Sequence, residues 1–191
     1  MKKALAISLA LSAGILYAQE FKPGSRVSDF QLRDLDGHAV AFTALKGPIT
    51  VVTFIATECP VSNSYNQRMI DMFLDYMPRN VKFIFVNANR AESAVEVRNH
   101  ARSVGFPFPV YKDLNNAMAD RFDAQVTPET FVIDASGIIR YHGAIDDSVH
   151  DSRVTKRPLR AALDALLNGK PVPSAETKAF GCTIKRVRKA S

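Results

Sequence analysis

Residues 49–69, ITVVTFIATECPVSNSYNQRM, contain the change of pattern that decides the fold. Residues 49–56 are a β-branched run that is apolar on both faces, which is typical of a central strand covered by helices on either side. From Pro60 onward, apolar residues recur at helical spacing: Val61, Tyr65, Met69, Met72, Phe73 and Tyr76. Pro60 suits the first helical position, where its missing N–H costs nothing. The sequence therefore predicts a strand, then Cys59, then an amphipathic helix.

Strands and helices alternate along the rest of the chain. We expect strands over residues 81–86 and 110–111, helices over residues 91–104, 114–122 and 157–167, and hairpins over residues 29–42 and 130–142. This alternation is typical of an α/β domain. We therefore predict an α/β fold with a central mixed β-sheet flanked by helices and with an N-terminal β-hairpin.

The first eighteen residues form a segment of their own. Lys2 and Lys3 precede a short apolar stretch that ends in Ala18, which is the layout of a secretory signal peptide; a buried N-terminal helix is the alternative. We predict a signal peptide over residues 1–18, one folded domain over 19–170 and a basic tail over 171–191. The mature protein is expected to be exported, periplasmic or secreted. It should have no integral membrane segment, because no later stretch has about 18 consecutive apolar residues.

The positive charge gathers at the C-terminus. The formal net charge is +6, and no acidic residue follows Glu176, whereas Lys185, Arg186, Arg188 and Lys189 do. Basic tails can attract nucleic acid or anionic membranes. The sequence shows no aromatic interleaving and no recognition helix, so we expect a solvated tail and no nucleic-acid partner.

Cys59 is expected where the central strand ends and a helix begins, which is where functional residues gather in α/β sheets. Unpaired N–H groups and the positive end of the helix dipole stabilise an anion, so they lower the pKa of a thiol. The neighbouring Glu58 carboxylate has the opposite effect. A buried structural cysteine is the alternative, but it would have no need of a helix start. We therefore predict that Cys59 is a reactive thiol.

Four stretches carry a resemblance that covers residues 21–186. They are FIATECPVSNSY (54–65), DRFDAQVTPETFVIDASGIIRYHGAIDD (120–147), LRAALDALLNGKPV (159–172) and FGCTIKR (180–186). Together they resemble thioredoxin-fold redoxins, in particular the peroxiredoxin-like branch of the alkyl hydroperoxide reductase/thiol-specific antioxidant superfamily. The resemblance implies a thioredoxin-like redoxin domain over residues 19–170 and a thiol-dependent oxidoreductase with antioxidant activity.

The resemblance also assigns roles to single residues. Cys59 takes the position of the attacking thiol. Pro128 takes the place of the cis-proline that faces this thiol, where it directs the backbone of Thr127 at a bound polypeptide or small thiol. Cis X–Pro bonds are only about 5–6% of such bonds in folded proteins, so this assignment rests on the resemblance.

The chain departs from the family's motifs at two places. Ser62 stands where thioredoxin-like enzymes carry the second cysteine of C-x-x-C. Val52 and Ala56 stand at the proline and threonine positions of the peroxiredoxin motif P-x-x-x-T-x-x-C, and Pro128 occupies the place of the catalytic arginine. Peroxide reduction needs groups that polarise the O–O bond beside the thiolate. We therefore expect disulfide exchange rather than fast peroxide reduction.

Cys182 is the only other cysteine in the chain. Residues 169–182 could extend to roughly 40 Å at about 3.3 Å per residue, which is far enough to cross a domain of this size. The two cysteines could form a redox-active pair or a permanent staple, or Cys182 could pair with another chain. We predict the redox-active pair, because a staple does not need a partner at the functional edge of the sheet. Lys185 and Arg186 would favour the Cys182 thiolate.

The predicted site therefore has Cys59 and Cys182 as catalytic residues, with Cys182 resolving the product. Its predicted substrate contacts are Thr57, Pro60, Thr127 and Pro128, and Thr57 or Arg121 could polarise a peroxide. The expected partners are an external thiol or thioredoxin-like electron donor and a disulfide-containing protein or small peroxide substrate.

Neither a cofactor nor a metal is predicted. The four histidines have no ligand spacing among themselves, and there is no Gly-rich phosphate loop. Asp146, Asp147 and Asp151 are expected in a solvated loop. The alternative function is a non-catalytic thioredoxin-fold binding module or copper carrier with a structural disulfide, in which Cys59 joins His142 or His150 as a ligand.

Overall fold

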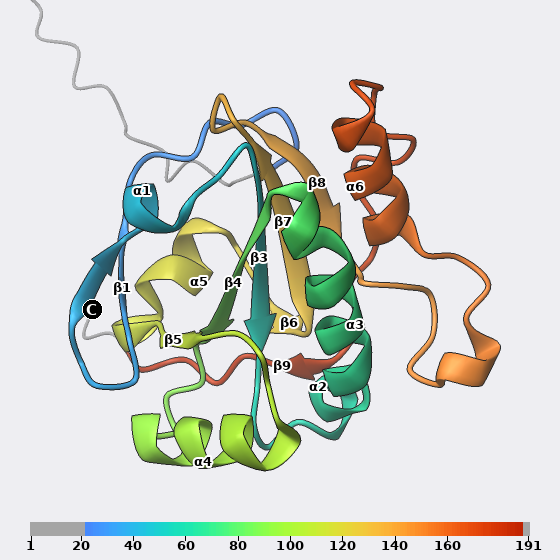
Figure 1. Ribbon diagram of the computed structural model, residues 1–191. Coiled ribbons are helices and arrows are strands. Elements are labelled where there is room, and N and C mark those ends of the chain that lie inside the picture. Colours follow the sequence, from blue (N-terminus) through green and yellow to red (C-terminus); the bar gives the residue numbers. More distant parts are fainter. Residues whose placement is uncertain (1–21, 189–191) are drawn as a thin grey trace, which may run out of the picture.

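The apolar run before Cys59 forms an interior strand of a seven-stranded mixed sheet in the computed structural model, which describes residues 22–188 (Figure 1). The strand order is β2-β1-β5-β4-β3-β7-β8. Strands β3, β4 and β5 are mutually parallel, whereas β7, β8, β1 and β2 pair antiparallel. The bounds are β1 Gln31–Arg33, β2 Ala39–Ala41, β3 Ile49–Ile55, β4 Val81–Asn87, β5 Val110–Lys112, β7 Glu129–Asp134 and β8 Ile139–Gly143. The predicted signal peptide, residues 1–18, lies outside the described residues.

The helices lie close to the predicted ranges, with sharper ends. They are α1 Phe42–Leu45, α2 Pro60–Ser64, α3 Asn66–Tyr76, α4 Ala94–Val104, α5 Ala117–Arg121 and α6 Pro158–Leu167, with 3₁₀ turns η1 Met77–Arg79, η2 Leu114–Asn116 and η3 Asp151–Arg153. Helix α4 begins three residues later than predicted, because Ser93 and Glu96 form a reciprocal capping box. The helix predicted from Pro60 is divided at Tyr65 into α2 and α3.

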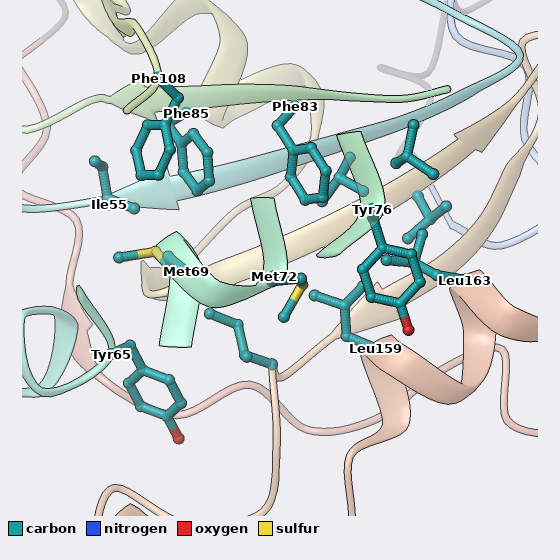
Figure 2. Packing of buried hydrophobic residues seen from close by; sticks show 14 of the residues in the cluster. Ile55, Tyr65, Met69, Met72, Tyr76, Phe83, Phe85, Phe108, Leu159 and Leu163 are labelled. Atoms are coloured by element: carbon teal, nitrogen blue, oxygen red, sulfur yellow. The ribbon is translucent and has the colours of Figure 1, made fainter. Parts of the chain in front are cut away.

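Both faces of the sheet are covered by helices, as the apolar run over residues 49–56 predicts. One cluster packs α3, α4 and α6 on the sheet; Figure 2 shows Met69, Met72, Tyr76, Leu159 and Leu163 facing Ile55, Phe83 and Phe85. The other cluster packs α1 and α5 on the opposite face, against Phe54 and Phe131. Since successive side chains of a strand point to opposite faces, β3 contributes to both clusters. The α/β fold with a central mixed sheet is confirmed.

The described part of the C-terminal tail packs on the rest of the structure, so the prediction of a solvated tail is wrong for Ile184, Arg186 and Val187, whereas Lys178 and Lys185 are exposed. Strand β9 (Cys182–Thr183) pairs antiparallel with β6 (Val126–Thr127) in a separate two-stranded sheet. In Figure 1 the tail runs across the ends of β3 and β4 at which the arrowheads lie. Ile184 is only 3% exposed and joins the core beside α5. No helix within residues 22–188 is both long enough and apolar enough to cross a bilayer.

Candidate active site

Cys59 is the N-terminal cap of α2. Its backbone is extended, Pro60 follows in the first turn, and its Sγ accepts a hydrogen bond from the Ser62 N–H at 3.2 Å. An N-cap side chain ordinarily offers an oxygen to this orphan N–H group, and here sulfur takes that place. The same hydrogen bond favours the thiolate when Cys59 is reduced, because it stabilises the charged form.

Ser62 makes a structural contact at the position where C-x-x-C enzymes carry their second cysteine. Its side chain is buried, and its hydroxyl accepts a hydrogen bond from the Ala56 N–H at 3.1 Å. Ala56 follows the last residue of β3, so Ser62 connects the end of the strand to the first turn of α2. Ser62 therefore supports the bend that presents Cys59.

Cys59 and Cys182 form a disulfide within the chain, with their Cα atoms 5.9 Å apart and 123 residues between them in sequence. Cys59 is only 3% exposed, whereas Cys182 is half-buried. Cys182 is therefore the more exposed residue of the pair.

The predicted contacts Thr127 and Pro128 lie against this disulfide. The Thr127–Pro128 peptide bond is cis, as the resemblance implies, and the Thr127 carbonyl oxygen is 3.5 Å from the Cys59 Sγ. In the small sheet, Thr127 is the register partner of Cys182. The tail thus lies beside the backbone segment at which a bound polypeptide was predicted. Pro60 is exposed at the other side of Cys59.

Thr57 is held by a buried carboxylate that the sequence did not indicate. The Glu92 carboxylate, 2% exposed, accepts hydrogen bonds from the Thr57 hydroxyl (2.5 Å), the Thr57 N–H (2.8 Å) and the Glu58 N–H (3.2 Å). It also accepts from the side-chain amides of Asn87 and Asn89. Burial raises the pKa of Glu92, but these donors outweigh burial and keep the pKa below its ordinary value. Because the Thr57 hydroxyl proton points at Glu92, Thr57 orients the segment before Cys59.

Lys112 is a buried cation beneath the same network. Its Nζ donates to the Asn87 side-chain oxygen and the Glu92 carbonyl oxygen, both at 2.6 Å, and to the Asn89 carbonyl oxygen at 3.0 Å. Burial lowers the pKa of Lys112. All three of its ammonium protons thereby have an acceptor, which is the condition for burying an ammonium group.

The other charged residues that the sequence placed near the cysteines are bonded to groups of the protein. Arg121 is engaged with Ser28 and with the Asp29 carbonyl oxygen, 3.1 Å away, on the N-terminal segment. Arg186 forms an ion pair with Asp120 at 2.8 Å, and the Lys185 Nζ lies 3.8 Å from the Glu58 carboxylate, with both side chains exposed. Lys185 and Glu58 therefore offset each other's charge beside the disulfide.

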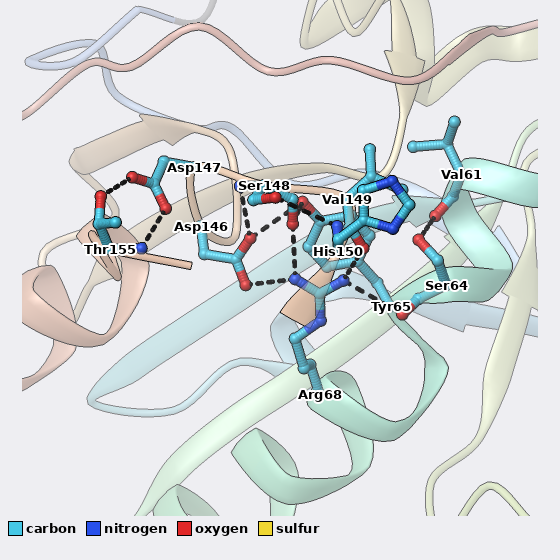
Figure 3. Close-up of polar contacts among 10 residues, drawn as sticks. All are labelled: Val61, Ser64, Tyr65, Arg68, Asp146, Asp147, Ser148, Val149, His150 and Thr155. Carbon is cyan, nitrogen blue, oxygen red and sulfur yellow. Dashed lines mark hydrogen bonds and ion pairs between the residues drawn. The ribbon is translucent and has the colours of Figure 1, made fainter. Parts of the chain in front are cut away.

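The loop after β8 is clamped onto α2 and α3 (Figure 3). Arg68 forms an ion pair with Asp146 at 2.7 Å and donates to the Ser148 and Val149 carbonyl oxygens, while the Tyr65 hydroxyl donates to Asp146 and Ser148. Asp146 is almost fully buried, so the prediction of a solvated loop is wrong for this residue. The same contacts fix the Tyr65 side chain at the point where α2 ends and α3 begins.

His142, one of the two histidines in the copper-carrier alternative, contacts Glu129 and Phe131. The His142 Nε2 lies 2.6 Å from Glu129 Oε1, and its ring stacks on Phe131 at 4.2 Å. Across residues 22–188, no group of three or more His, Cys, Asp and Glu side chains is arranged to hold a metal ion. Within residues 22–188, the two cysteine sulfurs and the cis-proline turn lie together.

Comparison with known proteins identifies a family and several relatives of this chain. The model of the AhpC/TSA family matches residues 23–142. Thiol-disulfide oxidoreductase ResA of Bacillus subtilis (strain 168) is 28% identical over 119 residues, 62% of this chain and 65% of the relative. Peroxiredoxin Q, chloroplastic, of Oryza sativa subsp. japonica is 27% identical over 126 residues, 62% of this chain and 57% of the relative. The match thus spans less than two thirds of the length of either curated relative.

A solved structure is similar over more of the chain. The crystal structure of an uncharacterized conserved protein from Geobacillus kaustophilus has a TM-score of 0.83 and 33% sequence identity, and the match covers 89% of this chain and 95% of that one. A hypothetical protein from Sinorhizobium meliloti 1021 has a TM-score of 0.80 at 28% identity, with 90% and 98% covered. The similarity to these two structures therefore extends beyond the region that the family model matches.

Proposed function

The chain belongs to the AhpC/TSA family, and on that premise we propose that it is an exported thiol–disulfide oxidoreductase that uses Cys59 and Cys182. The observation that carries the proposal is the position of the Cys59 sulfur. It caps a helix, is joined to Cys182 and lies 3.5 Å from the carbonyl oxygen before the cis-proline. Export rests on the pattern of residues 1–18 alone.

The reaction follows from the two sulfurs. The Cys59 thiolate attacks a substrate disulfide, forms a mixed disulfide and releases one substrate thiolate. The Cys182 thiolate then attacks the Cys59 sulfur, which re-forms the Cys59–Cys182 bond and releases the second substrate thiolate. The substrate gains two electrons and the protein loses two. An external dithiol restores them, and its first attack falls on Cys182, the more exposed of the two cysteine residues.

The leaving group of that reductive step is the Cys59 thiolate. The Ser62 N–H, 3.2 Å away, stabilises the charge that Cys59 acquires as the disulfide breaks. Thr127 and Pro128 border the reacting sulfur, and Pro60 is exposed beside it. These three residues are the proposed substrate contacts; Pro60 is open to a substrate as it stands, whereas Thr127 and Pro128 are buried while Cys182 is paired with Thr127. Thr57 supports Cys59 through Glu92.

Disulfide exchange is favoured over fast peroxide reduction by the groups around Cys59. Thr57 donates its hydroxyl proton to Glu92, and Arg121 is engaged with the N-terminal segment. Neither group is directed at a position where it would polarise an O–O bond next to the Cys59 sulfur.

Alkylation of Cys59 in the Cys182→Ser variant tests the proposal. We expect the rate of reaction with iodoacetamide to rise with pH with a half-point well below the free-thiol value of about 8.5. The Cys59→Ser variant, in which Cys182 is alkylated, is the control and should titrate nearer that value. We also expect the wild type to reduce a protein disulfide faster than hydrogen peroxide with the same dithiol donor. Inert Cys59 with no disulfide reduction would favour the binding-module alternative.

A further inference from the structure

Two buried asparagine side chains hold the tail just beyond Cys182. The Asn89 side-chain oxygen accepts a hydrogen bond from the Lys185 N–H at 2.8 Å. The Asn116 side-chain oxygen accepts one from the Val187 N–H at 2.7 Å. Asn89 follows β4 and Asn116 follows β5, so the two amides stand at the ends of neighbouring parallel strands. Their side-chain oxygens accept hydrogen bonds from the tail backbone, as the carbonyl groups of a neighbouring strand would.

Each amide is fixed from its other end. The Asn89 Nδ2 donates to the Glu92 carboxylate at 2.8 Å, and the Asn116 Nδ2 donates to the Ala88 carbonyl oxygen. Both side chains are buried, 5% and 1% exposed. Asn116 also has a left-handed backbone, with φ of 57°, which asparagine tolerates better than most residues. The two acceptors are therefore oriented by partners that lie outside the tail.

The tail adds its own contacts over the same stretch. The Ile184 N–H donates to the Gln125 carbonyl oxygen and the Arg90 N–H donates to the Lys185 carbonyl oxygen, both at 2.9 Å. The Ile184 side chain is buried in the core beside α5. These contacts begin two residues after Cys182 and involve neither cysteine.

This docking matters because the two cysteines are 123 residues apart in sequence. A thiol on a free tail has an effective concentration in the millimolar range or below, and two thiols of a rigid frame have a far higher one. We propose that Asn89 and Asn116 are positioning residues that keep Cys182 opposite Cys59 after reduction. The distant cysteine then acts as the second cysteine of a C-x-x-C motif does. The inference rests on the proposed function only in its claim that the positioned Cys182 takes part in turnover.

The experiment measures the equilibrium between the protein dithiol and glutathione. Wild type, Asn116→Ala and Asn115→Ala are incubated in mixtures of reduced and oxidised glutathione, quenched in acid, alkylated and weighed by mass spectrometry. Asn115 is the matched control, because it has the same left-handed backbone, with φ of 60°, but an exposed side chain. We expect Asn116→Ala to lower the equilibrium constant for forming Cys59–Cys182 about tenfold, and Asn115→Ala to leave it unchanged.

A variant of the tail itself covers the case in which Asn116→Ala does not fold. Val187→Pro removes the N–H that donates to the Asn116 side-chain oxygen, and it does not alter the buried loop that contains Asn116. Val187→Ala keeps this N–H and is the matched control. We expect the proline variant alone to lower the constant, again about tenfold, without changing the pH at which Cys59 is half alkylated in the Cys182→Ser background.

The outcomes separate the two proposals. A constant that is unchanged in both Asn116→Ala and Val187→Pro overturns the positioning role, even if the wild type reduces substrate disulfides. A tenfold loss in these variants with no turnover of any protein disulfide leaves the positioning role standing and contradicts the proposed function.

Discussion

The two sulfurs of the disulfide sit on segments that are held in different ways. Cys59 is fixed by its immediate neighbours: Pro60 begins the helix and the Ser62 N–H reaches the sulfur. The segment from Cys182 to Val187 is held by Thr127, Asn116 and Asn89, whose partners in that segment lie 55, 71 and 96 positions further along the chain. A local arrangement of this kind persists when the covalent link is cut, whereas docking of a chain end has to offset the entropy of ordering it. We therefore call the segment at Cys59 the rigid side, because it should keep its place when the disulfide is reduced. The segment at Cys182 is the conditional side, because its place depends on the tail remaining docked.

Removing the covalent link should give the largest effect. Cys182→Ser and Cys59→Ser each abolish the same cross-link, which closes a loop of 123 residues. The chain-entropy relation gives a loss of about 5 kcal/mol in the free energy of unfolding for either variant under oxidising conditions. Urea denaturation with and without dithiothreitol measures this loss. The three proteins should converge when reduced, and a gap that persists in dithiothreitol would show that the serines disturb packing instead.

Glu92→Gln tests the rigid side, and it should lower the free energy of unfolding by about 3 kcal/mol. The carboxylate accepts hydrogen bonds from Thr57, Glu58, Asn87 and Asn89, and a glutamine must turn an NH₂ group toward some of these donors. Unlike the loss of the disulfide, most of this cost should persist in the reduced protein, because only the Asn89 side chain among these donors also binds the tail. Glu58→Gln is the control, since the Glu58 side chain is 63% exposed. A cost below that of the control would contradict the structural role of Glu92.

The same variant should change how stability depends on pH. The pKa of folded Glu92 lies below its ordinary value, so its contribution is complete above the unfolded pKa of about 4.3. That contribution is lost as the pH falls through the folded pKa. The difference in unfolding free energy between wild type and Glu92→Gln should therefore shrink below about pH 4. A difference that grows on acidification would mean that burial, and not hydrogen bonding, governs this carboxylate.

The sequence predicted the rigid side better than the conditional side for a physical reason. The end of β3, the cap at Cys59 and Pro60 in the first turn are encoded within a dozen neighbouring residues, so pattern and propensity suffice. The cis bond before Pro128 followed from family resemblance. The residues that receive the tail gave no local signal: β9 has two residues, and Ile184 is an isolated apolar residue in a basic segment. Nothing in the sequence pattern distinguishes Asn89, Glu92 and Asn116 from ordinary loop residues, because their roles arise from contacts between distant segments.

The smallest effect expected is that of Gly181→Ala, and it should respond to reduction. A Cβ atom at Gly181 would lie 2.0 Å from the Thr127 carbonyl oxygen, whereas a Cβ at Gly47 would meet only the flexible side chain of Lys82. In the oxidised protein the tail cannot move away, so Gly181→Ala should cost about 2 kcal/mol and Gly47→Ala much less. In the reduced protein the residues around 181 can shift off Thr127 while Ile184 stays docked, so the cost should fall by about half. Urea denaturation of both variants, with and without dithiothreitol, measures these costs. A cost for Gly181→Ala that stays constant on reduction would mean that the Cys182 segment is as rigid as the helix start at Cys59.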